Sequence, residues 1–165
     1  MCSSHRSLSC EACGAPVSAI DGREHFLCQF CDSLVFGQPL ESCQDRIVGT
    51  EDEGDGTCPR CDQPLRVGKL DHRNVEYCQT CRGIWLSTNA FVDVLNGRRS
   101  NYRGPQLTPV PLDPKELDVR RPCPGCRRVM EVHPYHGKGN AVIDSCHRCL
   151  SIWLDPGEIT SLERV

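Results

Sequence analysis

Short apolar runs, rather than long amphipathic stretches, mark the elements of this chain. Apolar and polar residues alternate over 129–133 and again over 142–144, and this period of two predicts a pair of β-strands. The glycine-rich stretch 137–140 separates them and predicts a hairpin loop. A three-residue apolar run at 34–36 predicts another short strand. We therefore expect mainly β structure, made of small antiparallel hairpins.

Two short helices are expected after the later apolar runs. Residues 87–95 predict a helix that Gly97 terminates. The sequence Asp155-Pro156-Gly157-Glu158 predicts a helix start, with Asp155 as the N-cap and Glu158 in a capping box. Capping explains Glu158 more simply than a catalytic role does.

Cysteine pairs frame the predicted hairpins. The chain has 14 Cys among 165 residues but only 4 Phe, 3 Tyr and 2 Trp, so small units held by metal or disulfides are expected. Two cysteines three apart on a tight turn aim both sulfurs at one point, and two such turns complete a tetrahedron around Zn²⁺. The predicted ligand sets are Cys10, Cys13, Cys28 and Cys31; Cys58, Cys61, Cys78 and Cys81; and Cys123, Cys126, Cys146 and Cys149.

We expect Zn²⁺, one ion per set and three in all, rather than disulfides. Residues 1–6 lead into no apolar run, so no signal peptide is expected, and no segment approaches the roughly 18 apolar residues of a membrane span. In a cytoplasmic chain, paired C-x2-C motifs favour metal. Four thiolates leave no open position, which indicates structural rather than catalytic zinc. Iron remains the alternative metal, because the same thiolate set accepts it.

The cysteine pairs divide the chain into three predicted zinc ribbons and two linkers. The ribbons occupy residues 1–36, 58–97 and 123–165. Residues 37–57 carry six acidic side chains against one arginine and predict a solvated, mobile linker. Residues 98–122 contain five prolines and predict an extended linker.

The second and third ribbons form an internal repeat. The first cysteine pair recurs after 65 residues, and the second pair with its Ile-Trp-Leu recurs after 68, so the hairpin loop absorbs the difference. Trp85 and Trp153 recur with it and predict apolar caps over the zinc knuckles; base-stacking platforms are the alternative. We expect these two ribbons to pack together, because exposed apolar strands and tryptophans seek cover.

The third ribbon resembles the transcription factor IIB-type zinc ribbon family. It carries Cys-Pro-x-Cys and then Cys-x-x-Cys-x-x-Ile-Trp-Leu-Asp-Pro-Gly-Glu. The second ribbon is similar through residues 83–86 but has Ser-Thr-Asn-Ala at 87–90 in place of the family's Asp-x-Gly-Glu, and the first shares only the cysteines. The resemblance implies the fold, and a link to transcription follows from analogy alone.

Charge separates the possible classes of partner. The formal net charge is −3, and each Zn²⁺ with four thiolates adds two negative charges, so the loaded chain carries about −9. This argues against a simple nucleic-acid binder. Residues 98–128 nevertheless hold eight basic against three acidic residues. The candidates for anion or nucleic-acid contacts are Arg98, Arg99, Arg103, Arg120, Arg121 and Lys138.

Two further features carry candidate chemistry. Residues 133–140 combine two histidines, Lys138 and backbone amides next to glycines, which suits an anion cradle or an ordinary hairpin tip. Cys2 and Cys43 lie outside the pairs and are either redox-active thiols or incidental cysteines.

Together these features predict a small, metal-stabilised, mainly β protein of three tandem zinc ribbons, with short helices after the second and third. The leading hypothesis is a non-enzymatic adaptor of a protein complex, with no membrane partner and no small-molecule substrate. There are two alternatives. One is a nucleic-acid-binding protein that uses the basic residues of 98–128, which we call the basic stripe. The other is a thiol switch that releases zinc. The sequence has no Ser-His-Asp set, no G-x-x-x-x-G-K loop and no open metal position, so no enzyme is expected.

Overall fold

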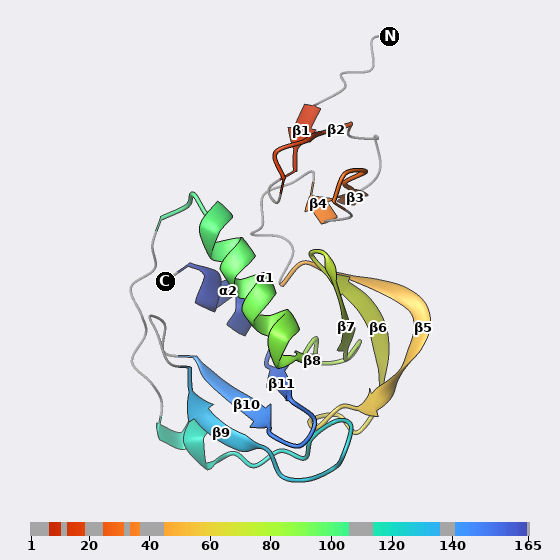
Figure 1. Ribbon diagram of the computed structural model, residues 1–165. Coiled ribbons are helices and arrows are strands. Elements are labelled where there is room, and N and C mark those ends of the chain that lie inside the picture. The colour runs from red at the N-terminus through yellow and green to blue at the C-terminus, as the bar shows by residue number, and fades with distance from the viewer. Residues whose placement is uncertain are drawn as a thin grey trace.

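The computed structural model confirms the predicted fold class, a mainly β protein held by cysteine clusters (Figure 1). It describes residues 7–10, 13–18, 25–31, 34–36, 45–105, 114–135 and 141–164. Within these ranges the strands form three antiparallel sheets, and two α-helices follow the second and third ribbons. None of the described helices is long and apolar enough to cross a membrane.

The first ribbon consists of two small hairpins. Strand β1 (Ser7–Ser9) pairs with β2 (Pro16–Ser18), and β3 (His25–Leu27) pairs with β4 (Leu34–Phe36). Its core is a small cluster in which Val17 and Val35 lie beside the cysteines. So little apolar burial does not hold 30 residues together without a staple.

The second and third ribbons share one sheet of seven strands, in the order β5-β6-β7-β8-β11-β10-β9. The second ribbon's half contains β5 (Ile47–Thr57), β6 (Pro64–Leu70), β7 (Arg73–Tyr77) and β8 (Ile84–Ser87). The third ribbon's half contains β9 (Glu131–Pro134), β10 (Val142–Cys146) and β11 (Ser151–Leu154). The alternating stretches of the sequence thus form β9 and β10, as predicted.

The two halves meet where β8 pairs with β11. Trp85 lies opposite Trp153, Ile84 opposite Leu154, and Leu86 opposite Ile152. These are the repeated Ile-Trp-Leu residues, and their antiparallel register relates the two ribbons by a local pseudo-twofold axis between the tryptophans. The contact is therefore isologous, as in a symmetric dimer, but lies within one chain.

One face of this sheet packs against the helices. Helix α1 (Thr88–Asn101) buries Phe91, Val94 and Leu95 in a cluster with apolar residues of β8, β10 and β11. Helix α2 (Glu158–Glu163) adds Ile159 and Leu162, both 0% exposed. Figure 1 shows the two helices side by side over the sheet. This cluster has no cysteine and is the larger apolar core of the described chain.

The opposite face holds the tryptophans, and each packs against the knuckle of the other ribbon. A Cβ on Gly83, beside the second ribbon's cysteines, would lie 2.2 Å from the indole of Trp153. A Cβ on Gly125, within a cysteine pair of the third ribbon, would lie 2.8 Å from the indole of Trp85. The tryptophans are thus apolar caps on the knuckles, and they join the two ribbons as well.

The predicted acidic linker is wrong for residues 47–57, which form β5. Strand β5 lies at one edge of the sheet and pairs with β6 through two register irregularities. Tertiary contacts compensate for its charge and glycine content: Arg66 lies 3.6 Å from Glu53, and the Gly56 N–H donates to Glu76 at 2.9 Å. Backbone pairing with β6 overrides the local composition, which alone favours a solvated coil.

Three other local predictions need correction. Helix α1 continues through Gly97 to Asn101, so it is longer than the predicted helix and extends into the predicted second linker. That linker also contains a 3₁₀ helix, Pro114–Asp118, where an extended chain was predicted. Helix α2 begins at Glu158 with Gly157 as its N-cap, where Asp155 was predicted. The Glu158 carboxylate nevertheless accepts the Asp155 N–H at 2.7 Å, which is the hydrogen bond of the predicted capping box. The predicted hairpin loop 137–140, Cys2 and Cys43 lie outside the described residues.

A distant carboxylate supplies the cap that α2 lacks in its own sequence. Asp45 is 1% exposed, and its carboxylate accepts the Gly157 N–H at 2.6 Å and the Thr160 hydroxyl at 2.8 Å. A carboxylate at a helix N-terminus satisfies a free amide and opposes the helix dipole. Because Asp45 precedes β5, this contact ties the start of the second ribbon to the end of the third.

The contact between Gly83 and Trp153 predicts opposite effects for two glycine substitutions. Gly83→Ala places a methyl group against a fully buried indole and should lower the free energy of unfolding by about 1–3 kcal/mol. Gly97→Ala, in α1 with open space around its Cβ, should raise it by about 0.5–1 kcal/mol. Denaturant unfolding of the zinc-loaded variants measures both, and a neutral Gly83→Ala would contradict the packing described here.

Candidate metal centres

The twelve cysteines predicted as ligands come together in three groups of four. Within each group all four Sγ atoms lie within 4.8 Å of one another. The edge of a zinc tetrathiolate tetrahedron is about 3.8 Å for bonds of about 2.3 Å. Sulfur pairs in all three groups are separated by 3.6 Å. This is far longer than a disulfide of about 2 Å, and none of these twelve cysteines forms a disulfide.

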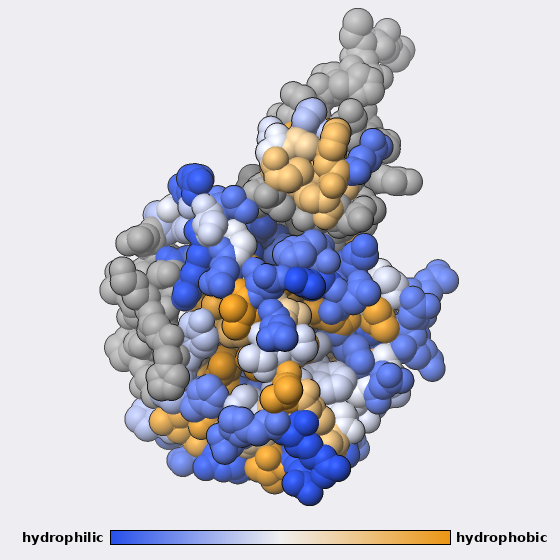
Figure 2. All heavy atoms as spheres, viewed as in Figure 1, coloured by the Kyte–Doolittle hydropathy of each residue, from blue (hydrophilic) through white to orange (hydrophobic). Residues whose placement is uncertain are grey.

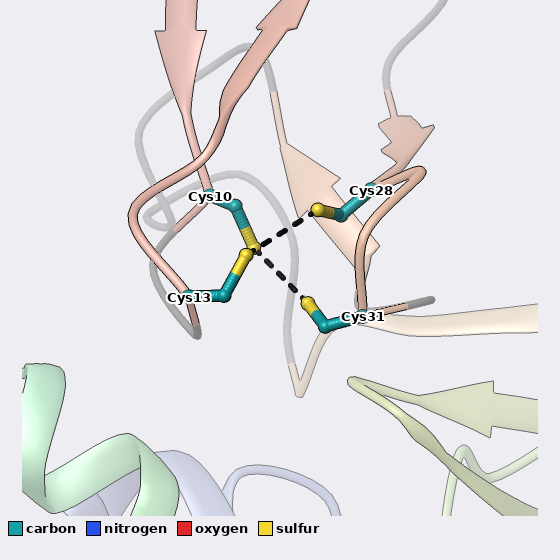
Figure 3. A group of neighbouring side chains, drawn as sticks. All are labelled: Cys10, Cys13, Cys28 and Cys31. Atoms are coloured by element: carbon teal, nitrogen blue, oxygen red, sulfur yellow. Dashed lines mark hydrogen bonds between the residues drawn. The ribbon is translucent and has the colours of Figure 1, made fainter.

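In the first group the four sulfurs converge from two loops (Figure 3). Cys10 and Cys13 follow β1, and Cys28 and Cys31 follow β3. Cys10 approaches Cys31, and Cys13 approaches Cys28, each at 3.6 Å. The two loops thus contribute a pair each to one tetrahedral site, as in the other two ribbons.

The same backbone turn builds the knuckles. The residue after the second cysteine donates its N–H to the carbonyl of the first cysteine, at 2.8–3.0 Å. That residue takes a left-handed conformation, and the described examples are Gly14, Asp62, Arg82, Arg127 and Leu150, with φ from 50° to 74°. This conformation costs a non-glycine residue free energy, and the metal site holds it in place. The turn also directs the amides of Arg60 and Cys61 at Cys58 Sγ, at 3.4 and 3.3 Å.

Four sulfurs at this separation need a cation. In the metal-free chain, burial raises the pKa of Cys58 and of Cys123, while the contact with Cys126 raises the pKa of Cys149 to about 12. The Arg128 amide lowers the pKa of Cys126 to about 7, so the group keeps one thiolate more readily than four. A bound Zn²⁺ balances the charge of all four thiolates.

The donor sets fit structural zinc, and the protein binds three Zn²⁺, one per ribbon. Each set offers four sulfurs and no carboxylate or histidine, so the tetrahedron closes without a position for water or substrate. The metal supplies a cross-link between two loops, and the surrounding chain positions the thiolates and buries six of the twelve cysteines.

The sites of the second and third ribbons share one apolar cluster. Cys58, Cys78, Cys123 and Cys146 are buried in it together with Trp153. The Thr57 amide also donates to the Pro124 carbonyl at 3.2 Å, from one ribbon's knuckle to the other's. The cysteines of the first ribbon lie in a separate cluster.

Arg98, one of the predicted anion-binding residues, is buried and paired with carboxylates. Its side chain is 3% exposed and lies 2.6 Å from Asp71 and 3.3 Å from Glu163. It also donates to the Asp45 carbonyl at 2.9 Å. A buried guanidinium with carboxylates on it is not accessible to a phosphate, so the prediction is wrong for Arg98.

The other predicted residues fall into two groups. Arg121 donates to Asp144 at 2.6 Å and to Asp155 at 2.8 Å. Arg99 donates to the Leu162 carbonyl at 2.9 Å and lies over the ring of Tyr135 at 5.7 Å. Arg103 and Arg120 are exposed, and both donate hydrogen bonds to carbonyls of neighbouring residues. Lys138 lies outside the described residues.

Sequence reasoning missed the carboxylates that hold these arginines. Asp71, Asp144 and Glu163 lie 27, 23 and 65 residues from their partners. Asp144 offered one signal, since it stands in an alternating strand and is 2% exposed there. A buried aspartate on a strand requires a cationic partner, but the sequence does not say which arginine it is.

Glu158 is half-buried at the start of α2, and its carboxyl group predicts a pH dependence of stability. Burial raises the pKa of Glu158 to about 9, from an ordinary value of 4.5. The folded state therefore binds a proton that the unfolded state has lost, and this contribution to stability disappears as the pH rises through the folded pKa.

Comparison with Glu158→Gln tests this, because glutamine keeps an acceptor for the Asp155 amide and does not ionise. The free energy of unfolding of the native chain should fall relative to that of the variant between about pH 6 and about pH 9. Urea unfolding in excess zinc gives the comparison. Parallel pH profiles would contradict a buried, protonated Glu158.

Two serine variants test how the metal sites are coupled. Cys28→Ser should remove one zinc per chain and leave the seven-stranded sheet folded, since its cluster is separate. Cys78→Ser should remove the zinc of the second ribbon and also weaken zinc binding in the third by about tenfold or more, because the two sites share a core. Metal analysis and competitive chelation measure both. Equal behaviour of the two variants would contradict the coupling.

The comparisons with known proteins agree with this geometry. Residues 57–97 match the family model described as a transcription factor zinc-finger, the TFIIB-type zinc ribbon. The match covers about a quarter of the chain and falls on the second ribbon, whereas the family's motif is most complete in the third. No curated protein and no solved structure gives a significant match. Residues 57–97 are thus similar to the zinc ribbons of the transcription factor IIB type, and their four cysteines lie together as a metal-ligand set.

Proposed function

We propose that the protein is a non-enzymatic adaptor that binds other proteins through a scaffold of three zinc ribbons. The observation that carries this proposal is the use of its arginines. Within the basic stripe, Arg98 and Arg121 bind internal carboxylates, and Arg99 binds a carbonyl and a tyrosine ring. Fewer arginines of the stripe are therefore available to bind polyanions, and the zinc-loaded chain keeps a strongly negative net charge.

The knuckles supply apolar contact points instead. Phe30, within the second cysteine pair of the first ribbon, is 76% exposed. Leu150 and Val129, which follow cysteine pairs of the third ribbon, are 68% and 66% exposed. Figure 2 shows an apolar group on the N-terminal ribbon and further apolar groups among the hydrophilic residues of the rest of this face. Exposed aromatic residues on rigid turns are typical of protein-binding surfaces.

The same geometry argues against an enzyme. Each described metal set closes with four sulfurs, and the Glu158 carboxylate accepts the Asp155 N–H at the start of α2. The link to transcription rests on the family match at residues 57–97, and with it the partner would belong to a transcription complex.

Binding to nucleic acids is the discriminating test. The zinc-loaded chain should show no saturable binding to duplex DNA, single-stranded DNA or RNA, because Arg98 and Arg121 bind internal carboxylates and the net charge is negative. Fluorescence anisotropy at low and at physiological salt measures this. Binding that weakens steeply with salt, and that is lost in an Arg103→Ala/Arg120→Ala double variant, would overturn the proposal in favour of a nucleic-acid binder.

The complementary experiment is quantitative affinity purification of the full chain. Phe30→Ser should deplete a defined set of partner proteins at unchanged zinc content. Val92→Ser, which alters an exposed valine on α1 away from the knuckles, is the matched control.

A further inference from the structure

The pseudo-twofold axis between β8 and β11 allows the surroundings of the two tryptophans to be compared position by position. Around Trp153, the indole N–H donates to Asp155 at 3.2 Å. Two arginines reach the same carboxylate: Arg121 of the third ribbon at 2.8 Å and Arg60 of the second at 3.3 Å. Arg121 also binds Asp144 at 2.6 Å. Guanidinium groups therefore occupy the polar space beside Trp153.

The repeat identifies the equivalent residues around Trp85. The offset of 65 that relates the first cysteine pairs places Gly56 at the position of Arg121, and Gly125 at the position of Arg60. The sheet supports this alignment, because the bridge between Pro122 and Val129 corresponds to the pairing of Thr57 with Pro64. Both arginines of the Trp153 side are thus glycines on the Trp85 side.

One of the two acidic residues of the arginine site is kept in the other copy of the repeat, although both arginines are replaced. The offset of 68 that relates the second cysteine pairs places Glu76 at the position of Asp144, and Ser87 at the position of Asp155. Glu76 lies opposite Trp85 in the sheet and accepts the Gly56 N–H through one carboxylate oxygen, at 2.9 Å. One carboxylate therefore remains beside Trp85 without a guanidinium among the described residues.

A hollow of about 330 Å³ lies beside Trp85, and Glu76 and Ser87, the counterparts of the two aspartates that bind Arg121, both line it. It lies at the small end of the range for ligand sites, about 300–1,000 Å³. Its polar lining consists of Asn74, Glu76, Trp85, Ser87, Cys149 and Ser151. We call this the Trp85 hollow.

Two polar groups of the Trp85 hollow are unsatisfied. Ser151 is 4% exposed, and its hydroxyl has no hydrogen-bond partner. The indole N–H of Trp85 has none either, whereas that of Trp153 binds Asp155. Buried polar groups without a partner are rare in folded proteins, and here both belong to residues that line the hollow.

The chemistry of the Trp85 hollow selects a cation. Glu76 carries a negative charge, and Cys149 belongs to a zinc tetrathiolate of net charge −2. The indole of Trp85 offers an aromatic face to a cation, and the Ser151 hydroxyl offers an acceptor for an N–H donor. For an anion, the repulsion from Glu76 and the thiolates opposes any hydrogen bond from the indole N–H or the hydroxyl.

We propose that the Trp85 hollow binds the guanidinium group of an arginine side chain from a partner protein. The arginine donates to Glu76 and Ser151 and lies against Trp85, in the place that the repeat gives to Arg121 on the other side of the axis. A planar, fork-shaped cation suits this site because guanidinium groups fill its counterpart. The inference rests on the proposed adaptor function and adds a site and a partner chemistry to it.

The test uses the full, zinc-loaded, ¹⁵N-labelled chain and the indole N–H signals of its two tryptophans. The probe is the peptide acetyl-Gly-Arg-Gly-amide, and the control peptide has citrulline, which keeps the shape of arginine and lacks its charge. The arginine peptide should shift the Trp85 signal saturably and leave the Trp153 signal in place, since the latter N–H is already bonded to Asp155. The citrulline peptide should bind at least about tenfold more weakly.

Two variants assign the effect to the hollow. Glu76→Gln keeps an acceptor for the Gly56 amide and should weaken arginine binding about tenfold or more. Ser151→Ala removes an unpartnered hydroxyl, so it should fold normally and also weaken binding. Glu131→Gln removes the same charge from an exposed position on β9 and is the matched control. Zinc content shows that each variant is folded.

A Trp85 signal that does not move, that responds equally to citrulline, or that responds fully in both Glu76→Gln and Ser151→Ala would overturn the inference. None of these results touches the adaptor function, which is tested by nucleic-acid binding and by the Phe30 variant. Conversely, tight nucleic-acid binding would defeat the adaptor function whatever the arginine peptide does.

Discussion

The bond between thiolate and Zn²⁺ is the interaction on which every other part of this structure depends. The first ribbon buries two valines beside its cysteines, and the second and third ribbons place their cysteines in the cluster around Trp153. Apparent zinc binding of about 10–16 kcal/mol per site is larger than what so small a core supplies. It also holds the residues after the cysteine pairs in left-handed conformations that the chain would otherwise avoid.

The second constraint is the pairing of β8 with β11. A single ribbon of this kind exposes an apolar edge strand and a tryptophan, and the repeat covers both by placing two copies around a local twofold axis. The result is one sheet with two different faces: an aliphatic face beneath the helices and a face on which the tryptophans pack against the knuckles. The two copies of the repeat can also differ in sequence. Arginines lie beside Trp153, whereas glycines occupy the equivalent positions of the copy that contains the Trp85 hollow.

The sequence predicted the metal ligands and the short strands well, because both depend on local spacing. The twelve cysteines, the alternating stretches that form β9 and β10, and the packing of the two repeated ribbons were all readable from the chain. Strand β5 was not, since its acidic residues and glycines favour a coil until β6 offers a backbone partner. Arg98 and Arg121 were misjudged for a related reason: their carboxylate partners are distant in the sequence, and local charge counts take no account of burial.

Hydrogen exchange of the zinc-loaded chain tests most directly the central claim, that the second and third ribbons form one cooperative unit. The amides of β8 and β11 should exchange with one common free energy of opening, and removal of zinc from either ribbon should expose both strands together. Slow exchange in one strand while the other opens independently would contradict this account and would leave two ribbons that merely lie side by side.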